Sequence, residues 1–84
     1  MNTIAAEANT LVPALLALEQ LGFTVLVEGD GARELFRATR SEETFVADDP
    51  LALLGLIKLI EARGWRWQAT DQQIEGILRR YVLA

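Results

Sequence analysis

The sequence predicts a small α+β domain in which three helices pack on one face of a three-stranded antiparallel meander, in the order α-β-β-β-α-α. Apolar residues recur at helical spacing in three separate segments. Between the first two lies a block rich in β-branched and aromatic residues, interrupted by an Asp-Gly pair, which is the strongest short-range hairpin signal. The chain has 84 residues and no linker, repeat or low-complexity run, so we expect one domain over residues 1–84.

The first helix is expected over residues 10–21. Asn9 or Thr10 can serve as its N-cap, and Pro13 fits within a first turn, where its missing N–H does no harm. Gly22 then follows as the C′ glycine. The helical stripe consists of Leu11, Ala14, Leu15, Leu18 and Leu21. Residues 1–9 are weakly specified: the sequence leaves open whether they are ordered, form a short helix over 3–9, or continue into one kinked helix.

Three strands are expected next. Residues 23–28 alternate Phe, Val and Val on one face, and Asp30-Gly31 provides the turn. Residues 33–40 then return antiparallel. A helix over residues 32–38 also fits the periodicity, and only the hairpin turn favours the strand. After a second turn at 41–43, residues 44–47 predict a short third strand. In the second strand one side carries Phe36 and Ala38, and the other carries Leu35, Arg37 and Thr39.

Both remaining helices have clear starting signals. Asp49 followed by Pro50 is an N-cap with proline at the first helical position, and Gly64 ends this helix after residue 63. Thr70 and Gln73 have the spacing of a capping box for the last helix. The core stripe of the second helix is Leu53, Leu56, Ile57 and Ile60, and that of the last helix is Ile74, Ile77, Leu78, Tyr81 and Val82.

The composition argues against most enzyme classes. The chain contains no histidine and no cysteine, and Ser41 is its only serine. These residue types supply most nucleophiles, bases near neutral pH and transition-metal ligands. We therefore expect a non-enzymatic protein without cofactors, in which only carboxylate chemistry stays open. The absence of cysteine and of a signal or membrane-spanning segment leads us to expect a cytoplasmic protein that does not insert into membranes.

Two further motifs contain residue types found in metal or phosphate sites. Acidic residues gather around the predicted turns and could offer oxygen ligands to Ca²⁺ or Mg²⁺, but they lack the alternating ligand spacing of a calcium loop. The sequence around Gly29 could resemble a phosphate-binding loop, but a strand rather than a helix is expected after it. Cap and turn roles are therefore the preferred interpretation. The acidic residues are Asp30, Glu42, Glu43, Asp48 and Asp49.

Arginines and tryptophans interleave after the second helix, which is typical of proteins that stack on single-stranded nucleic acid. The net charge of −4 argues against such binding, and we expect both indoles to close the core instead. Charge is divided unevenly, with a balance of −6 over residues 1–49 and +2 over residues 50–84. The candidate nucleic-acid contacts are Arg63, Trp65, Arg66, Trp67, Arg79 and Arg80.

The first two long helices carry more apolar surface than one small sheet can cover. A helix that is apolar nearly all round lies at the centre of its domain or contacts another chain. The leading hypothesis is therefore a non-catalytic protein-interaction module, either a homodimer or a small accessory subunit. A weak nucleic-acid-binding or regulatory domain is the alternative. The possible interface residues are Val12, Leu16, Leu51, Leu54, Gly55 and Leu59.

Overall fold

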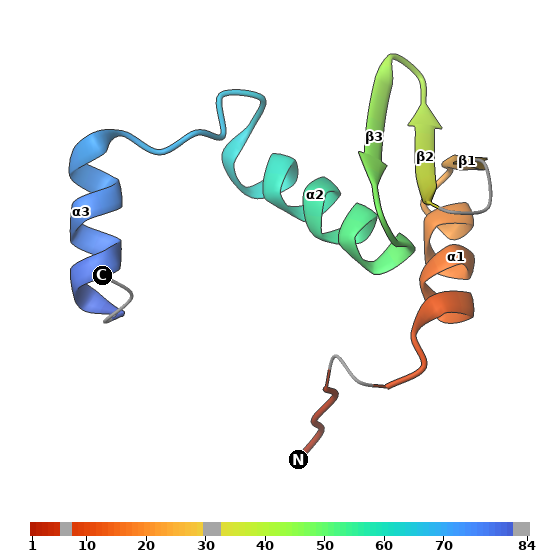
Figure 1. The fold of residues 1–84 in the computed structure, drawn as a ribbon, viewed down its shortest axis with the longest axis horizontal. Helices are drawn as coiled ribbons and strands as arrows, with labels where there is room; N and C mark the ends of the chain where they lie inside the picture. The colour runs from red at the N-terminus through yellow and green to blue at the C-terminus, as the bar shows by residue number, and fades with distance from the viewer. Residues whose placement is uncertain (6–7, 30–32, 82–84) are drawn as a thin grey trace.

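The computed structural model describes residues 1–5, 8–29 and 33–81 and confirms the order α-β-β-β-α-α (Figure 1). The elements are α1 (Leu11–Gln20), β1 (Thr24–Gly29), β2 (Glu34–Arg40), β3 (Glu43–Ala47), α2 (Pro50–Arg63) and α3 (Asp71–Arg80). No helix within these residues is long and apolar enough to cross a bilayer. The alternative of a helix over 32–38 is wrong, because β2 begins at Glu34. The alternative of one continuous N-terminal helix is also wrong, because α1 begins only at Leu11.

The three strands form the antiparallel meander β1-β2-β3. The pairs Gly29↔Glu34 and Thr24↔Thr39 fix the first hairpin, although its Asp30-Gly31 turn lies outside the described residues. The second turn is tighter than expected. Arg40 pairs directly with Glu43, so that Glu43 belongs to β3 and Ser41, with φ of 54°, begins a two-residue connection.

Gly29, the last residue of β1, has a positive φ. Its φ is 147°, and a Cβ at this position would lie 2.1 Å from the backbone oxygen of Arg33. Only glycine tolerates both the backbone angle and the close approach.

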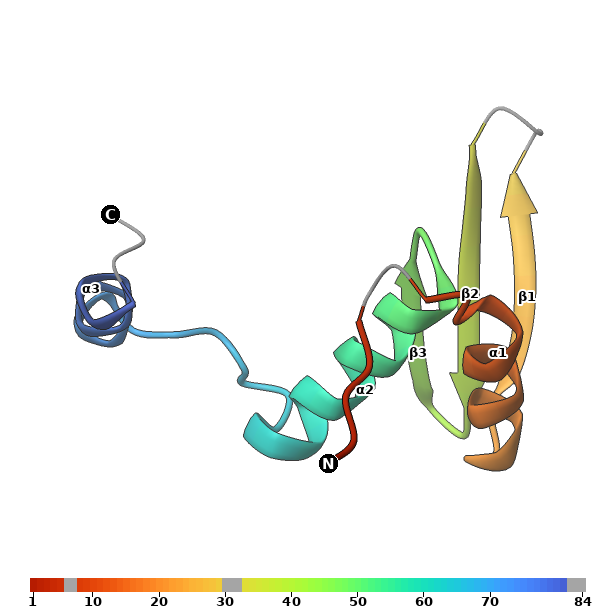
Figure 2. The same ribbon diagram turned by 90° about the horizontal axis from the view of Figure 1, so that it is seen from below.

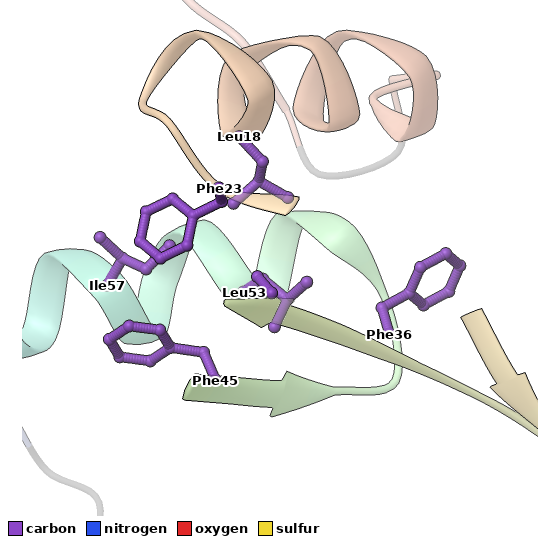
Figure 3. Close-up of a cluster of buried hydrophobic side chains, with 7 residues drawn as sticks. Leu18, Phe23, Phe36, Phe45, Leu53 and Ile57 are labelled. Carbon is purple, nitrogen blue, oxygen red and sulfur yellow. The ribbon is translucent and has the colours of Figure 1, made fainter. Parts of the chain in front are cut away.

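α1 and α2 lie on the same side of the sheet (Figure 2). Strand residues with period two point toward them, and buried residues from both helices meet these side chains (Figure 3). The rings of Phe23 and Phe45 pack edge to face, with centroids 5.9 Å apart. This core consists of Leu18, Phe23, Phe36, Ala38, Phe45, Leu53 and Ile57. The expected core stripes of the first two helices are confirmed at Leu18, Leu53 and Ile57.

The helix ends follow the sequence signals, with one exception. The Asp49 side chain accepts a hydrogen bond of 2.8 Å from the Ala52 backbone N–H, and the capping box between Thr70 and Gln73 is complete. Thr10 occupies the N-cap of α1, but its side chain makes no capping hydrogen bond.

The prediction that all three helices pack on the sheet is wrong for α3. It stands apart from the sheet and the other two helices in both views (Figures 1 and 2), and none of its residues from Asp71 to Arg80 is buried. The sheet and α1 pack against one side of α2, and α3 does not cover the apolar surface that remains on the second half of α2. Residues 64–70, called here the C-terminal arm, contain no helix or strand and lead away from α2.

Candidate protein-interaction surface

An exposed apolar surface lies where β3, the second half of α2 and the C-terminal arm meet. A shallow groove of 210 Å³ is lined there only by apolar side chains. The ring of Trp65 stacks on Phe45, with centroids 5.6 Å apart and an angle of 22° between the planes. We call this feature the apolar groove; its lining residues are Phe45, Leu56, Leu59, Ile60, Trp65 and Trp67.

Both tryptophans are exposed, which corrects the expectation that they close the core. Trp65 retains 58% and Trp67 43% of its accessible surface. The indoles are exposed because α3 does not pack on the rest of the fold. They would be covered only if a third helix lay against them. Trp65 contacts the core residue Phe45 by ring stacking.

Arg63 fixes the start of the C-terminal arm. Its Nε donates a 2.7 Å hydrogen bond to the backbone oxygen of Trp67, and Nη2 donates a longer one of 3.4 Å to that of Gln68. The arm therefore turns back over the end of α2 before it leaves, and this holds both indoles beside the second half of α2.

α3 presents a second apolar surface that is largely exposed, although Ile77 also lines a groove with Arg63 and Ala69. Four apolar residues lie within an arc of about 100° on this helix, given 100° of rotation per residue. Three of them are exposed, and Leu78 is half-buried. A helix of ten residues is only marginally stable in water without tertiary packing, even with a good cap. We call this surface the α3 stripe; it consists of Ile74, Ile77, Leu78 and Tyr81, while Val82 lies outside the described residues.

Of the six predicted interface residues, five lie outside the apolar groove. Val12 and Leu16 of α1 and Leu51 of α2 are exposed, and Gly55 has open space around its Cα. Leu54 is half-buried against the core, and only Leu59 lines the apolar groove. Sequence reasoning missed Leu56 and Ile60 as groove residues, because their helical spacing assigns them to the core stripe.

The candidate nucleic-acid residues are brought together only in part. Arg63 and Arg80 line a common groove of 460 Å³ between α2 and α3, and the two indoles lie on the neighbouring apolar groove. Arg80 also lies over its neighbour Tyr81, at 5.7 Å from the ring centroid. Arg66 and Arg79 are exposed and line neither groove.

Three of the acidic residues have structural partners. Glu43 pairs with Arg40 at 3.0 Å, Asp48 lies 3.9 Å from Arg33, and Asp49 caps α2. Over residues 1–5, 8–29 and 33–81, no three acidic side chains converge as metal ligands. Asp30 falls outside these ranges.

One ion pair changes the titration of its members. Glu28 of β1 and Arg37 of β2 lie on the outer face of the sheet and are joined by a hydrogen bond. The guanidinium lowers the pKa of the Glu28 carboxyl, first by this hydrogen bond and then by its charge. The same contacts raise the pKa of Arg37. This pair supports the sheet and does not adjoin the apolar groove.

Comparisons with protein-family models, with curated proteins and with solved structures find no match for this chain.

Proposed function

We propose that this chain is a non-catalytic protein-interaction module that works as a homodimer or as a small accessory subunit. The observation that carries the proposal is the amount of uncovered surface. The chain exposes 6928 Å², whereas a compact monomer of this size exposes about 5,000 Å². Its radius of gyration of 15.4 Å likewise exceeds the value of about 12 Å expected for a compact domain of this length.

Part of the uncovered surface is apolar. The apolar groove and the α3 stripe together expose two tryptophans, a tyrosine and several aliphatic side chains. Aromatic residues of this kind dominate the energetics of protein interfaces. The proposal locates the module in the cytoplasm, because the chain has no cysteine for the disulfides common in small secreted domains.

Light scattering and affinity capture test this function. We expect the purified chain to show either twice the monomer mass at micromolar concentration or a stable complex with a captured partner. A monomer mass from 1 to about 100 μM, a range spanning typical weak to moderate affinities, combined with no captured partner, contradicts the proposal.

A weak nucleic-acid-binding or regulatory role is the second candidate, favoured by the exposure of both indoles beside Arg63. Stacking on tryptophan tolerates any base and adds to backbone contacts made by arginine. This role predicts quenching of tryptophan fluorescence by an oligonucleotide, with an affinity that falls steeply as salt rises. An unchanged emission spectrum at low salt eliminates it.

A further inference from the structure

β1 is an edge strand of the meander, and the centre of its sequence reads the same in both directions, as Val25, Leu26 and Val27. Within the described residues β1 pairs with β2 alone, so its other edge offers backbone N–H and C=O groups to a further strand. We propose that two copies of this chain associate through β1, paired antiparallel about a two-fold axis at Leu26, so that their two sheets become one. This inference rests on the proposed interaction function and names its partner and its surface.

The free edge of β1 lacks the features by which proteins usually protect an edge. Protected edge strands are very short, carry lysine or proline, contain a bulge or lie under a helix. β1 has six residues without lysine or proline, and its pairing with β2 runs without a bulge from Thr24 to Gly29. No helix lies beyond β1 at this side of the fold (Figure 2). Such an edge is typical of strands that accept another strand.

Both faces of this edge expose apolar side chains that a neighbouring strand would cover. Val27 lies opposite the buried Phe36 in the ladder, and opposite residues point to the same face of a sheet. Val27 nevertheless retains 58% of its accessible surface, although it faces the side on which the helices pack. Leu26, on the outer face, retains 57%. Pairing of a further strand with β1 would therefore remove apolar surface from water on both sides of the sheet.

The symmetry of β1 favours a second copy over an unrelated strand. A two-fold axis perpendicular to the joined sheet keeps every side chain on its own face, so the residue at the axis lies opposite its own counterpart. With Leu26 at the axis, leucine lies opposite leucine on the outer face, and Val25 of each copy lies opposite Val27 of the other on the inner face. An unrelated partner would have to supply a strand with this same pattern, which the chain already contains.

The same register keeps like charges apart. Glu28 is the charged residue of β1, and with Leu26 at the axis it lies opposite Thr24 of the other copy. Like charges directly opposite one another destabilise a pair of strands, so an axis at Glu28 is unfavourable. Glu28 is also hydrogen-bonded to Arg37 of its own chain, which balances its charge. The axis at Leu26 therefore combines apolar pairing with the absence of a carboxylate repulsion.

β3, at the other edge of the sheet, lacks this symmetry. An axis at its central residue, Phe45, would place Thr44 opposite Val46 and Glu43 opposite Ala47, so that polar residues would face apolar ones. The ring of Phe45 already stacks on Trp65. Of the two edges, β1 is therefore the one that complements itself.

Charged substitutions at the axis test this register in the full-length chain. In a dimer of one variant, Leu26→Lys or Leu26→Glu places two like charges opposite one another, whereas a mixture of the two places a lysine opposite a glutamate. Val46→Lys and Val46→Glu are the matched controls. Val46 is exposed on the same outer face and also lies beside Arg37, but it belongs to the other edge of the sheet. Far-UV circular dichroism checks that all four variants fold.

Sedimentation equilibrium of each chain and of the mixture measures the association. We expect a dimer for the wild type and for both Val46 variants. The dissociation constant should be at least about 10-fold higher for each Leu26 variant alone, because like charges replace an apolar pair. An equimolar mixture of Leu26→Lys and Leu26→Glu should associate at least about 10-fold more tightly than either variant alone, because opposite charges then meet at the axis.

Three outcomes overturn the β1 contact, and they differ in what they leave standing. A wild-type dimer that both Leu26 variants form with unchanged affinity places the contact elsewhere and leaves the homodimer intact. A wild-type dimer that both Leu26 variants weaken, with no gain in their mixture, contradicts the axis at Leu26 and also leaves the homodimer intact. A wild-type monomer up to about 100 μM excludes a second copy, and the proposed function then depends on affinity capture alone.

Discussion

A comparison of two leucines on α1 tests whether the core is where the structure places it. Leu18 is fully buried, whereas Leu16, two residues away on the same helix, retains 53% of its accessible surface. Replacing each by alanine makes the same chemical change at the same helix propensity. Only the environment differs, so the two losses of stability measure burial directly.

The expected magnitudes follow from burial. Leu18→Ala removes buried methyl groups and leaves a cavity between α1, β2 and α2, at a cost of about 3–4 kcal/mol. Leu16→Ala leaves no cavity, because half of the side chain already faces water, and we expect a loss below about 1 kcal/mol. A domain of this length has about 4–13 kcal/mol of total stability, so the Leu18 change removes a large fraction of it.

Urea unfolding followed by far-UV circular dichroism measures both losses. We expect the midpoint to fall sharply for Leu18→Ala with an unchanged m-value, and to change little for Leu16→Ala. In thermal unfolding, the Leu18 change should lower Tm by about 12–30 °C. Equal losses at the two positions would refute the assignment of the core. A large loss at Leu16 that grows with protein concentration would instead identify Leu16 as an interface residue.

Four further substitutions test local features of the fold. Gly29→Ala should destabilise the β1–β2 hairpin by more than about 1 kcal/mol in urea unfolding, because its Cβ would meet the Arg33 backbone; Gly55→Ala, with open space around it in α2, should stabilise the chain slightly. Thr70→Ala removes one half of the capping box and should destabilise α3 by about 1 kcal/mol, seen as faster amide exchange in its first turn; unchanged exchange would contradict the capping role. Because the pKa of Glu28 is lower in the folded chain, its pairing with Arg37 stabilises the fold above the ordinary carboxyl pKa and is lost as pH falls through the lowered value. Stability measured from pH 7 downward should therefore fall more steeply for the wild type than for Glu28→Gln, and parallel curves would show that the pair contributes nothing.

The sequence predicts which types of residue form the candidate interaction surface. It does not predict where on the fold that surface lies. Excess apolar area on α2 follows from its leucine and isoleucine content, and the amphipathic α3 follows from the spacing of its apolar residues. Which side of α2 stays uncovered depends on where the sheet and α1 pack. For this reason Leu54 is half-buried against the core, whereas Leu56, which has the spacing of a core residue, lines the apolar groove.

The sequence alone determines the elements whose signals are local. Asp49-Pro50 starts α2, Thr70 and Gln73 start α3, and alternation in residues 23–28 makes β1, because a cap or a strand period involves atoms only a few residues apart. Tertiary structure alone decides that α3 stands apart, that Trp65 and Trp67 face solvent, and that the apolar groove lies open. These features depend on which apolar faces cover one another. That outcome is determined by packing between segments that are far apart in the sequence.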